Sequence, residues 1–314
     1  MHRKSLALVL LIAVAFVAWP QTSAQNSEAQ AANHNTQVVM LGTGTPNLDP
    51  ERSGPAVAVV VNGSAYLVDF GPGVVRRAAA AQQQKHIEAL NPGNLKIAFA
   101  THLHSDHTTG LADLFLSPAV GERKVPLTLY GPPGLAAMAA HIRAAYIKDI
   151  AIRVRGLERE DPKPFTMIVH EIKPGVIYKD QNVTVTAFRV PHGSWDYAYG
   201  YRFDTADRSI VISGDTAPSD AVVKACNGCD LLVHEVYSQE WFATKPADRK
   251  KYHASFHTST AELAGVAGGA RPKMLVLYHQ LFIKGQEPGP VLIKEMRTAG
   301  YLGHVVSAND LDVF

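Results

Sequence analysis

Thr-His-Leu-His-Ser-Asp-His, at residues 101–107, follows directly on an apolar run at 95–100 that is typical of a buried β-strand. The stretch places four metal-capable side chains within six residues: His102, His104, Asp106 and His107. Zinc binds both neutral imidazole nitrogens and carboxylate oxygens. The alternative, a solvated histidine-rich turn, does not explain why the cluster lies where a strand leads into a helix. The stretch therefore predicts a metal site.

Three further metal-capable side chains lie at the ends of other strand-like runs. They are His192, Asp215 and His279, and each follows closely on an apolar segment. Each alone is compatible with a surface role. Because α/β proteins assemble binding sites from the ends of separate strands, the shared position of all three favours metal ligation.

Strand-like runs recur along the chain, with helix-like segments between and after them. Runs typical of strands lie at residues 38–41, 56–61, 65–70, 95–100, 127–130, 166–172, 183–190, 199–203, 209–213, 231–234 and 274–279. Segments typical of helices lie at 74–89, from about 109, and at 133–148, 219–226, 258–268 and 290–299. This order predicts an α/β fold in which helices cover the outer faces of the sheets.

The N-terminal residues have the order of a secretory signal. A basic start at 2–4 precedes an apolar run at 6–19, and small residues follow Pro20. The run is shorter than the roughly 20 residues that a membrane-spanning helix needs, so we predict cleavage and no stable membrane span rather than an uncleaved anchor. We assign residues 1–24 to a signal peptide, 25–36 to a disordered linker and 37–314 to one domain. A periplasmic or secreted location follows from this assignment.

Neither the charge nor the cysteines of the chain indicate a further partner. The formal net charge is +2, with both signs interspersed, which gives no indication of nucleic-acid binding. The two cysteines, Cys226 and Cys229, are too few for a structural zinc site, which needs four ligands. We interpret them as two small, half-buried side chains at the end of a helix. The alternative, in an oxidising compartment, is a disulfide.

Taken together, these features resemble the metallo-β-lactamase superfamily, and within it the branch that contains ribonuclease Z and the metallo-β-lactamase-type arylsulfatases. The resemblance covers nearly everything after the linker. It includes Leu-Gly-Thr-Gly-Thr-Pro at 41–46, Tyr-Gly-Pro at 130–132, Tyr-Gly-Tyr-Arg at 199–202, Gly-Asp-Thr at 214–216, Val-His-Glu at 233–235 and His-Thr-Ser at 257–259. It implies a zinc-dependent hydrolase built as an αββα sandwich, in which two mixed β-sheets pack face to face with helices on the outside.

The resemblance also implies how the metal-capable residues divide between two zinc ions. The first ion would be held by His102, His104 and His192, the second by Asp106, His107 and His279, and both by a bridging Asp215. Ions about 3.5–4 Å apart would share a hydroxide that acts as the nucleophile, and the second ion would stabilise the charge that develops on the substrate. Manganese and iron are alternatives, because His and Asp ligands suit several divalent ions.

Two more residues gain a role from the resemblance. His257 matches the position that helps protonate the leaving group in ribonuclease Z, and Glu235 would orient its ring and raise its pKa. With Asp106, these are the residues that we predict to be catalytic. The alternative for His257 is a surface position where a helix begins. Asp69 would orient the metal loop by hydrogen bonds, or simply end a strand.

Three functions compete for this chain. The first is an exported hydrolase of small esters, either aryl sulfates or phosphodiesters. The second is a ribonuclease Z-like endoribonuclease that trims the 3′ ends of transfer RNA precursors. The third is a zinc-binding protein without turnover, which leaves His257 and Glu235 unexplained. Trp195, Tyr197 and Tyr199 would form an aromatic wall beside an aryl group, or pack in the core.

Two arguments favour the small-ester hydrolase. An exported chain does not meet transfer RNA, and only residues 203–213 separate Arg202 from Gly214, where ribonuclease Z carries a long arm that binds transfer RNA. We therefore expect a small-molecule ester as the substrate and no nucleic acid as a partner. The resemblance alone suggests a homodimer.

Overall fold

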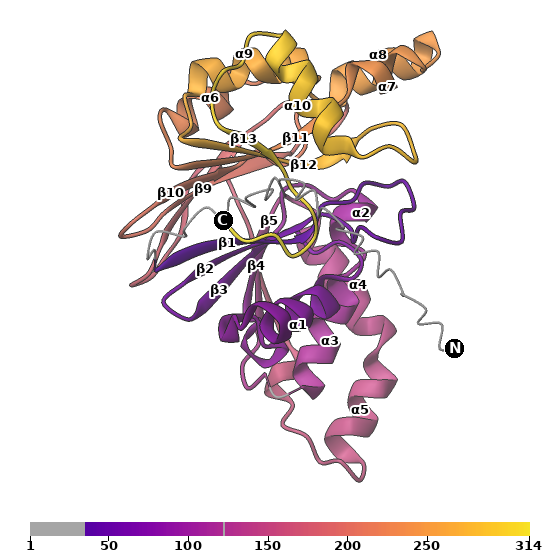
Figure 1. Cartoon of the computed structure of the whole chain (residues 1–314). Coiled ribbons are helices and arrows are strands. Elements are labelled where there is room, and N and C mark those ends of the chain that lie inside the picture. Colours follow the sequence, from indigo (N-terminus) through magenta and orange to yellow (C-terminus); the bar gives the residue numbers. More distant parts are fainter. Residues whose placement is uncertain (1–34, 122) are drawn as a thin grey trace, which may run out of the picture. The chain divides into compact units, whose positions relative to one another are not determined.

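The computed structural model describes residues 35–121 and 123–314, whose course is drawn in Figure 1. The predicted signal peptide and residues 25–34 of the predicted linker lie outside this part of the chain. The first strand begins at Thr36, one residue ahead of the predicted start of the domain. No helix within the described residues is long and apolar enough to cross a membrane.

The first layer is a six-stranded mixed sheet. Its strands, in spatial order, are β1 (Thr36–Gly42), β2 (Ala56–Val61), β3 (Ser64–Val68), β4 (Ile97–Phe99), β5 (Leu127–Gly131) and β6 (Met167–Glu171). The first three pair antiparallel, and β3 to β6 pair parallel. The loop that leaves β4 carries the histidine-rich stretch 101–107.

The second layer is a seven-stranded mixed sheet. Its strands, in spatial order, are β13 (Val305–Ser307), β12 (Met274–Leu281), β11 (Leu231–Tyr237), β10 (Ser209–Ile212), β9 (Tyr199–Asp204), β8 (Thr184–Arg189) and β7 (Gly175–Lys179). The strands from β10 to β13 pair parallel, and those from β7 to β10 pair antiparallel. The sequence did not predict β7 or β13, because one is largely exposed and the other has only three residues.

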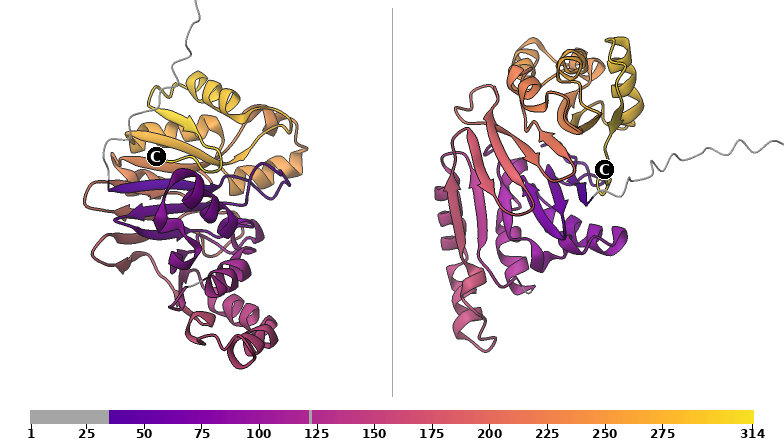
Figure 2. Two further views of the ribbon diagram at one scale, coloured as in Figure 1. Left: turned by 60° about the horizontal axis from the view of Figure 1, so that its bottom comes forward. Right: turned by 90° about the vertical axis from the view of Figure 1, so that its left-hand side faces the viewer.

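The two sheets pack face to face on a shared apolar core. In this core the ring of Phe99 in β4 lies 5.6 Å from that of Tyr201 and 5.7 Å from that of Phe203, both in β9. The outer face of the first sheet is covered by α1 (Val74–Lys85), α3 (Leu111–Val120) and α4 (Leu135–Ala145). The outer face of the second is covered by α6 (Asp220–Cys226), α9 (Thr260–Ala270) and α10 (Pro288–Thr298). The predicted αββα sandwich is therefore confirmed (Figure 2).

The remaining helices are short or lack a buried face. They are α2 (Ser105–Thr108), α5 (Ile147–Arg155), α7 (Gln239–Ala243), α8 (Ala247–Phe256) and the 3-10 turns η1 (Glu88–Leu90), η2 (Pro92–Asn94) and η3 (Lys163–Phe165). The predicted helix at 133–148 ends at Ala145, and α5 follows it. The sequence did not predict α8, which has no buried residue and hence no apolar stripe.

The interpretation of the two cysteines as half-buried, unpaired side chains was wrong. Cys226 ends α6, and its sulfur forms a disulfide with Cys229. Asn227 and Gly228 between them have φ angles of 38° and 83°, a left-handed turn that returns the chain on itself. Both cysteines are 1% exposed and pack in the core between α6 and the second sheet.

Candidate metal centre

The seven predicted metal ligands come together from both sheets. His102 and His104 lie in the loop after β4, Asp106 and His107 in α2, His192 after β8, Asp215 after β10, and His279 in β12. All but two of these side chains are buried in the described structure; His104 and Asp106 are partly exposed. The strand ends thus deliver the whole predicted set to one site, although sequence neighbours supply only four of its members.

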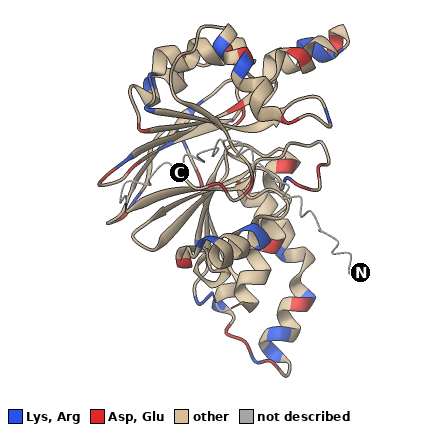
Figure 3. Ribbon diagram, in the orientation of Figure 1, with Lys and Arg blue, Asp and Glu red and all other residues tan. Residues whose placement is uncertain are grey.

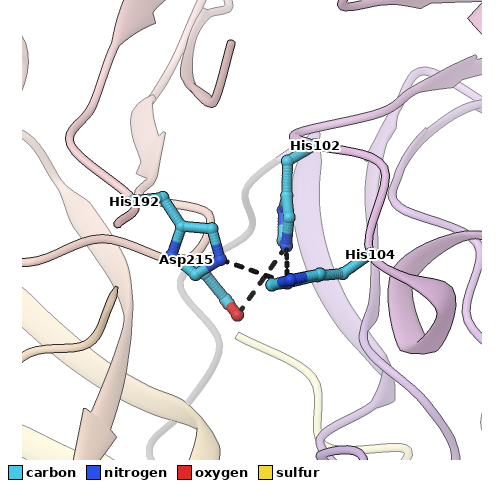
Figure 4. Close-up of side chains that lie close together, drawn as sticks. All are labelled: His102, His104, His192 and Asp215. Carbon is cyan, nitrogen blue, oxygen red and sulfur yellow. Dashed lines mark hydrogen bonds and ion pairs between the residues drawn. The ribbon is translucent and has the colours of Figure 1, made fainter. Parts of the chain in front are cut away.

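One group consists of His102, His104, His192 and Asp215 (Figure 4). Nε2 of His102 lies 2.9 Å from Nδ1 of His104, and Nε2 of His192 lies 3.2 Å from that same atom. Oδ2 of Asp215 lies 4.0 Å from Nε2 of His102. Three ring nitrogens and one carboxylate oxygen therefore converge on a common point.

A second group consists of Asp106, His107 and His279. Oδ2 of Asp106 lies 3.2 Å from Nε2 of His279 and 3.5 Å from Nε2 of His107. Oδ2 of Asp215 lies 3.4 Å from each of these two nitrogens. A single oxygen of Asp215 consequently faces both groups, which is the position that a bridging ligand requires.

A β-bulge turns His279 towards the second group. The pairing of β11 with β12 runs from Glu235 with Tyr278 to Val236 with Gln280, so His279 is the extra residue. Its φ angle of 42° is uncommon for a residue other than glycine. Backbone strain of this kind gathers at functional sites, where the surrounding fold holds it in place.

Hydrogen bonds on the far side of the rings fix which nitrogen faces the site. Nδ1 of His107 lies 2.8 Å from Oδ2 of Asp69, whose other oxygen accepts a 2.7 Å bond from the backbone N–H of Thr101. Nδ1 of His192 donates to the carbonyl oxygen of Phe256 at 2.7 Å. These bonds direct Nε2 of His107 and of His192 inwards, as metal ligation needs. The orienting role predicted for Asp69 agrees with this geometry.

Burial and charge set the protonation of the site. Burial lowers the pKa of His192 to about 3 and also lowers the pKa of His102 and His104, so these rings are neutral at pH 7. Burial opposes the ionisation of Asp215, but His279 and His107 outweigh it and hold its pKa well below the usual value. Neutral imidazoles and an ionised carboxylate are the forms that bind divalent metals. Burial opposes the charged forms of His107 and His279, but Asp215 outweighs it and raises the pKa of both. A metal ion that bound to these two rings would therefore displace their protons.

Two buried polar atoms without partners give further support for a metal ion at this site. Nε2 of His107 and Oδ1 of Asp215 are buried, and neither has a hydrogen-bond partner among the described residues. Leaving such atoms unsatisfied is costly, whereas a cation between the two groups would satisfy both. Nitrogen and oxygen donors at these positions suit zinc, and they suit other divalent ions as well.

The aromatic residues after His192 do not form a common wall. Tyr199 is buried in the core, and its hydroxyl donates to the carbonyl oxygen of Ile172. Tyr197 is largely exposed and lies beside Arg189. Trp195 alone contacts the site, where its Nε1–H donates to Nε2 of His104 at 2.8 Å. That bond requires an unprotonated Nε2, which places the ring proton on Nδ1. A metal ion bound through Nδ1 would require the other tautomer, so ligation through Nδ1 and the bond from Trp195 exclude each other.

His257 and Glu235 lie beside the second group. Nδ1 of His257 is 3.3 Å from Oε2 of Glu235 and 3.9 Å from Oδ2 of Asp215. Burial, together with Asp215, raises the pKa of Glu235 well above its usual value. Burial also lowers the pKa of His257 to about 4. Burial outweighs the attraction of Asp215 for the charged ring, so His257 is neutral at pH 7. The orienting effect of Glu235 on this ring stays a prediction.

Replacing Asp215 tests its shared position. We expect Asp215→Ala to bind fewer than two zinc ions per chain, because one side chain contributes to both groups. The metal content of the dialysed protein would be measured by elemental mass spectrometry. Asp220→Ala, at an exposed aspartate of α6, is the matched control and should retain the metal of the unaltered chain. Two ions per chain in Asp215→Ala would show that this carboxylate is not shared.

His234 gives a prediction about acid stability. It is fully buried, its Nδ1 donates to the carbonyl oxygen of Glu235 at 2.6 Å, and burial lowers its pKa to about 4. Between about pH 6.5 and 4 the unfolded chain therefore binds a proton that the folded chain does not, so stability falls on acidification by on the order of 3 kcal/mol from this group. In urea titrations of the chelator-treated protein, His234→Gln should flatten this pH dependence. An unchanged slope would assign the acid sensitivity to other groups.

Comparison with known sequences identifies relatives across most of the chain. A family model described as a β-lactamase superfamily domain matches residues 65–280. Ribonuclease Z of Mycobacterium sp. (strain KMS) is 34% identical over 255 residues, which cover 80% of this chain and 87% of that protein. Ribonuclease Z of Mycobacterium bovis (strain BCG / Pasteur 1173P2) is 31% identical over 280 residues, which cover 88% of this chain and 96% of that protein.

Solved structures share the fold. Human tRNase Z, short form, superposes with a TM-score of 0.60 at 26% identity and covers 88% of this chain and 98% of its own. The metallo-β-lactamase fold protein YhfI from Bacillus subtilis has a TM-score of 0.65 at 17% identity, with 89% and 98% covered. At that identity the second likeness bears on the fold alone.

These relatives overturn two expectations about the substrate. The chain is similar over most of its length to proteins named for a ribonuclease, so the preference for a small-ester hydrolase of the arylsulfatase type was wrong. The expected absence of a nucleic-acid partner was wrong for the same reason. Both expectations relied on the predicted export and on the short segment at 203–213, which forms the hairpin between β9 and β10. The hairpin is short, but its length has no bearing on the metal-capable residues of the site, which lie outside it.

Proposed function

Since this chain belongs to the β-lactamase superfamily, we propose that it is a metal-dependent endoribonuclease of the ribonuclease Z type. The observation that carries the proposal is the similarity to proteins named ribonuclease Z, which extends over at least 80% of the chain. The geometry agrees with it, because two groups of ligands that share Asp215 suit hydrolysis of a phosphodiester.

The chain's own residues divide the work around the phosphodiester. When bound, divalent ions would activate water at neutral pH and neutralise charge on the phosphate. His102, His104 and His192 supply neutral ligands on one side, and Asp106, His107 and His279 supply the other. Asp69 and the carbonyl of Phe256 keep two of these rings oriented.

His257 is placed to serve the leaving group as a hydrogen-bond donor. Its ring lies beside both Asp215 and Glu235, and its depressed pKa keeps it neutral at pH 7. A neutral imidazole still carries one N–H, which can donate to an oxygen of the phosphodiester. Because a ring nitrogen of His257 lies close to ligand atoms of Asp215 and His279, ligation of a metal is the alternative role of His257.

We also propose that the protein acts outside the cytoplasm. The N-terminal sequence has the order of an export signal, and Cys226 and Cys229 are joined in a buried disulfide. Disulfides persist in oxidising compartments and are rare in the cytosol. Its substrate would then be RNA that has left a cell, rather than a transfer RNA precursor in the cytoplasm.

Cleavage of RNA tests the proposed activity. The zinc-loaded chain from Gln25 should cut an end-labelled RNA that carries a single-stranded 3′ extension, as resolved on a denaturing gel. A chelator should abolish cutting and added zinc should restore it, because the ligands hold the ion that activates water. An aryl sulfate serves as the negative control. An intact RNA after incubation with a chain that holds two metal ions would refute the proposed function.

Thiol and N-terminal analysis tests the location. Protein isolated from the cells that produce it naturally should begin near Gln25 and should show no free thiol when denatured, as determined by mass spectrometry after alkylation. A chain that begins at residue 1 and carries two free thiols would contradict export.

A further inference from the structure

Helix α8 joins the metal centre at one end and extends into solvent at the other. Figure 1 shows α7 and α8 at the margin of the second layer. Ser255 and Phe256, the last two residues of α8, contact the site through their backbone. The carbonyl oxygen of Ser255 accepts a hydrogen bond from the N–H of Gly193, and that of Phe256 accepts one from Nδ1 of His192. The ring of Phe256 lies 4.9 Å from that of His192. The C-terminal end of α8 is therefore fixed on a metal ligand.

Gly193 makes this junction possible. It adopts a φ of 53°, and a Cβ at this position would lie 2.0 Å from Cε2 of Phe256. Only glycine accepts both the left-handed backbone and the close approach of the ring. The local sequence His192-Gly193 thus seats the aromatic end of α8 directly beside the site.

One face of α8 leads outwards from the metal centre. Arg249, Tyr252, His253 and Phe256 follow one another at helical spacing, so they share a face. The rings of Tyr252 and Phe256 are stacked, with centroids 4.4 Å apart, and Tyr252 is 36% exposed. An exposed aromatic ring next to a basic side chain is the arrangement with which proteins bind single-stranded nucleic acids.

The segment of α7 and α8 is also basic. Residues 239–256 carry four basic side chains, Lys245, Arg249, Lys250 and Lys251, against two acidic ones, Glu240 and Asp248. Figure 3 shows this mixture on the two helices. The ion pairs found among the described residues involve none of the four basic side chains. Their charges remain available to an anionic partner.

We propose that α8 binds the RNA strand next to the phosphodiester that is cut, with Tyr252 stacking on a base and Arg249 pairing with a backbone phosphate. This inference rests on the proposed ribonuclease function. It assigns to α8 the grip on RNA that the short hairpin between β9 and β10 does not provide. The contacts are to bases and phosphates in general, so the helix recognises single-stranded RNA without a fixed sequence.

The test compares a long and a small substrate of the same chemistry. An unstructured 20-nucleotide RNA and bis(4-nitrophenyl) phosphate would be hydrolysed by the zinc-loaded chain, and the ratio of the two kcat/KM values measured. Arg249→Ala and Tyr252→Ala should each lower this ratio by about tenfold, mainly through the KM for RNA. Tyr252→Phe keeps the ring and should restore the ratio. Lys294→Ala, at an exposed lysine of α10, is the charge-matched control and should leave it unchanged.

The salt dependence of RNA cleavage distinguishes a phosphate contact of Arg249 from a structural role, because a structural role would leave this dependence unchanged. The slope of log kcat/KM for RNA against log salt should become less steep by about 0.7 in Arg249→Ala, as expected when one phosphate contact is lost. An unchanged ratio in both variants, or an equal loss on both substrates, would overturn the role of α8 alone. Hydrolysis of the small diester without any cleavage of RNA by the unaltered chain would refute the proposed function and this inference with it.

Discussion

The buried carboxylate of Asp215 is the charge around which the site is organised. Its Oδ2 lies within 4.0 Å of ring nitrogens of His102, His107, His257 and His279, and the side chain is 2% exposed. An anion so far from water is stable only with compensating partners. Those partners come from the loop after β4 in one sheet and from β12 in the other, so both sheets must meet for the charge to be balanced. A divalent cation would complete that balance.

The fold holds the site in place through contacts outside the set of ligands. Asp69 has a left-handed φ of 60° at the end of β3, and from there it bonds both Thr101 and His107. His279 is turned inwards by a bulge, and His192 is held by the backbone of Phe256. The aromatic end of α8 thus belongs to the metal site, while its basic side chains reach solvent. In the proposed role, α8 would connect the site to the binding of a long substrate.

The sequence predicted which metal-capable side chains come together, because side chains of this kind that each follow an apolar run are rare by chance. It also predicted the two-sheet sandwich, through the resemblance that those ligands carry. It missed the carbonyl of Phe256, since a backbone acceptor has no residue type, and it missed α8, which buries no face. The disulfide was misjudged because the sequence Cys-Asn-Gly-Cys at 226–229 does not show that its two central residues form the left-handed turn that brings the sulfurs together. The preference for a small ester was wrong because it took a missing arm as evidence against the ribonuclease, although a short hairpin does not exclude RNA from the rest of the surface.

The proposed activity requires two metal ions between the two sheets, with Asp215 shared by both. Anomalous X-ray scattering at the zinc absorption edge, from crystals of the zinc-loaded chain, tests it most directly. We predict two peaks, one among His102, His104 and His192 and one among Asp106, His107 and His279, with Asp215 between them. A single peak, or two peaks that Asp215 does not join, would contradict it.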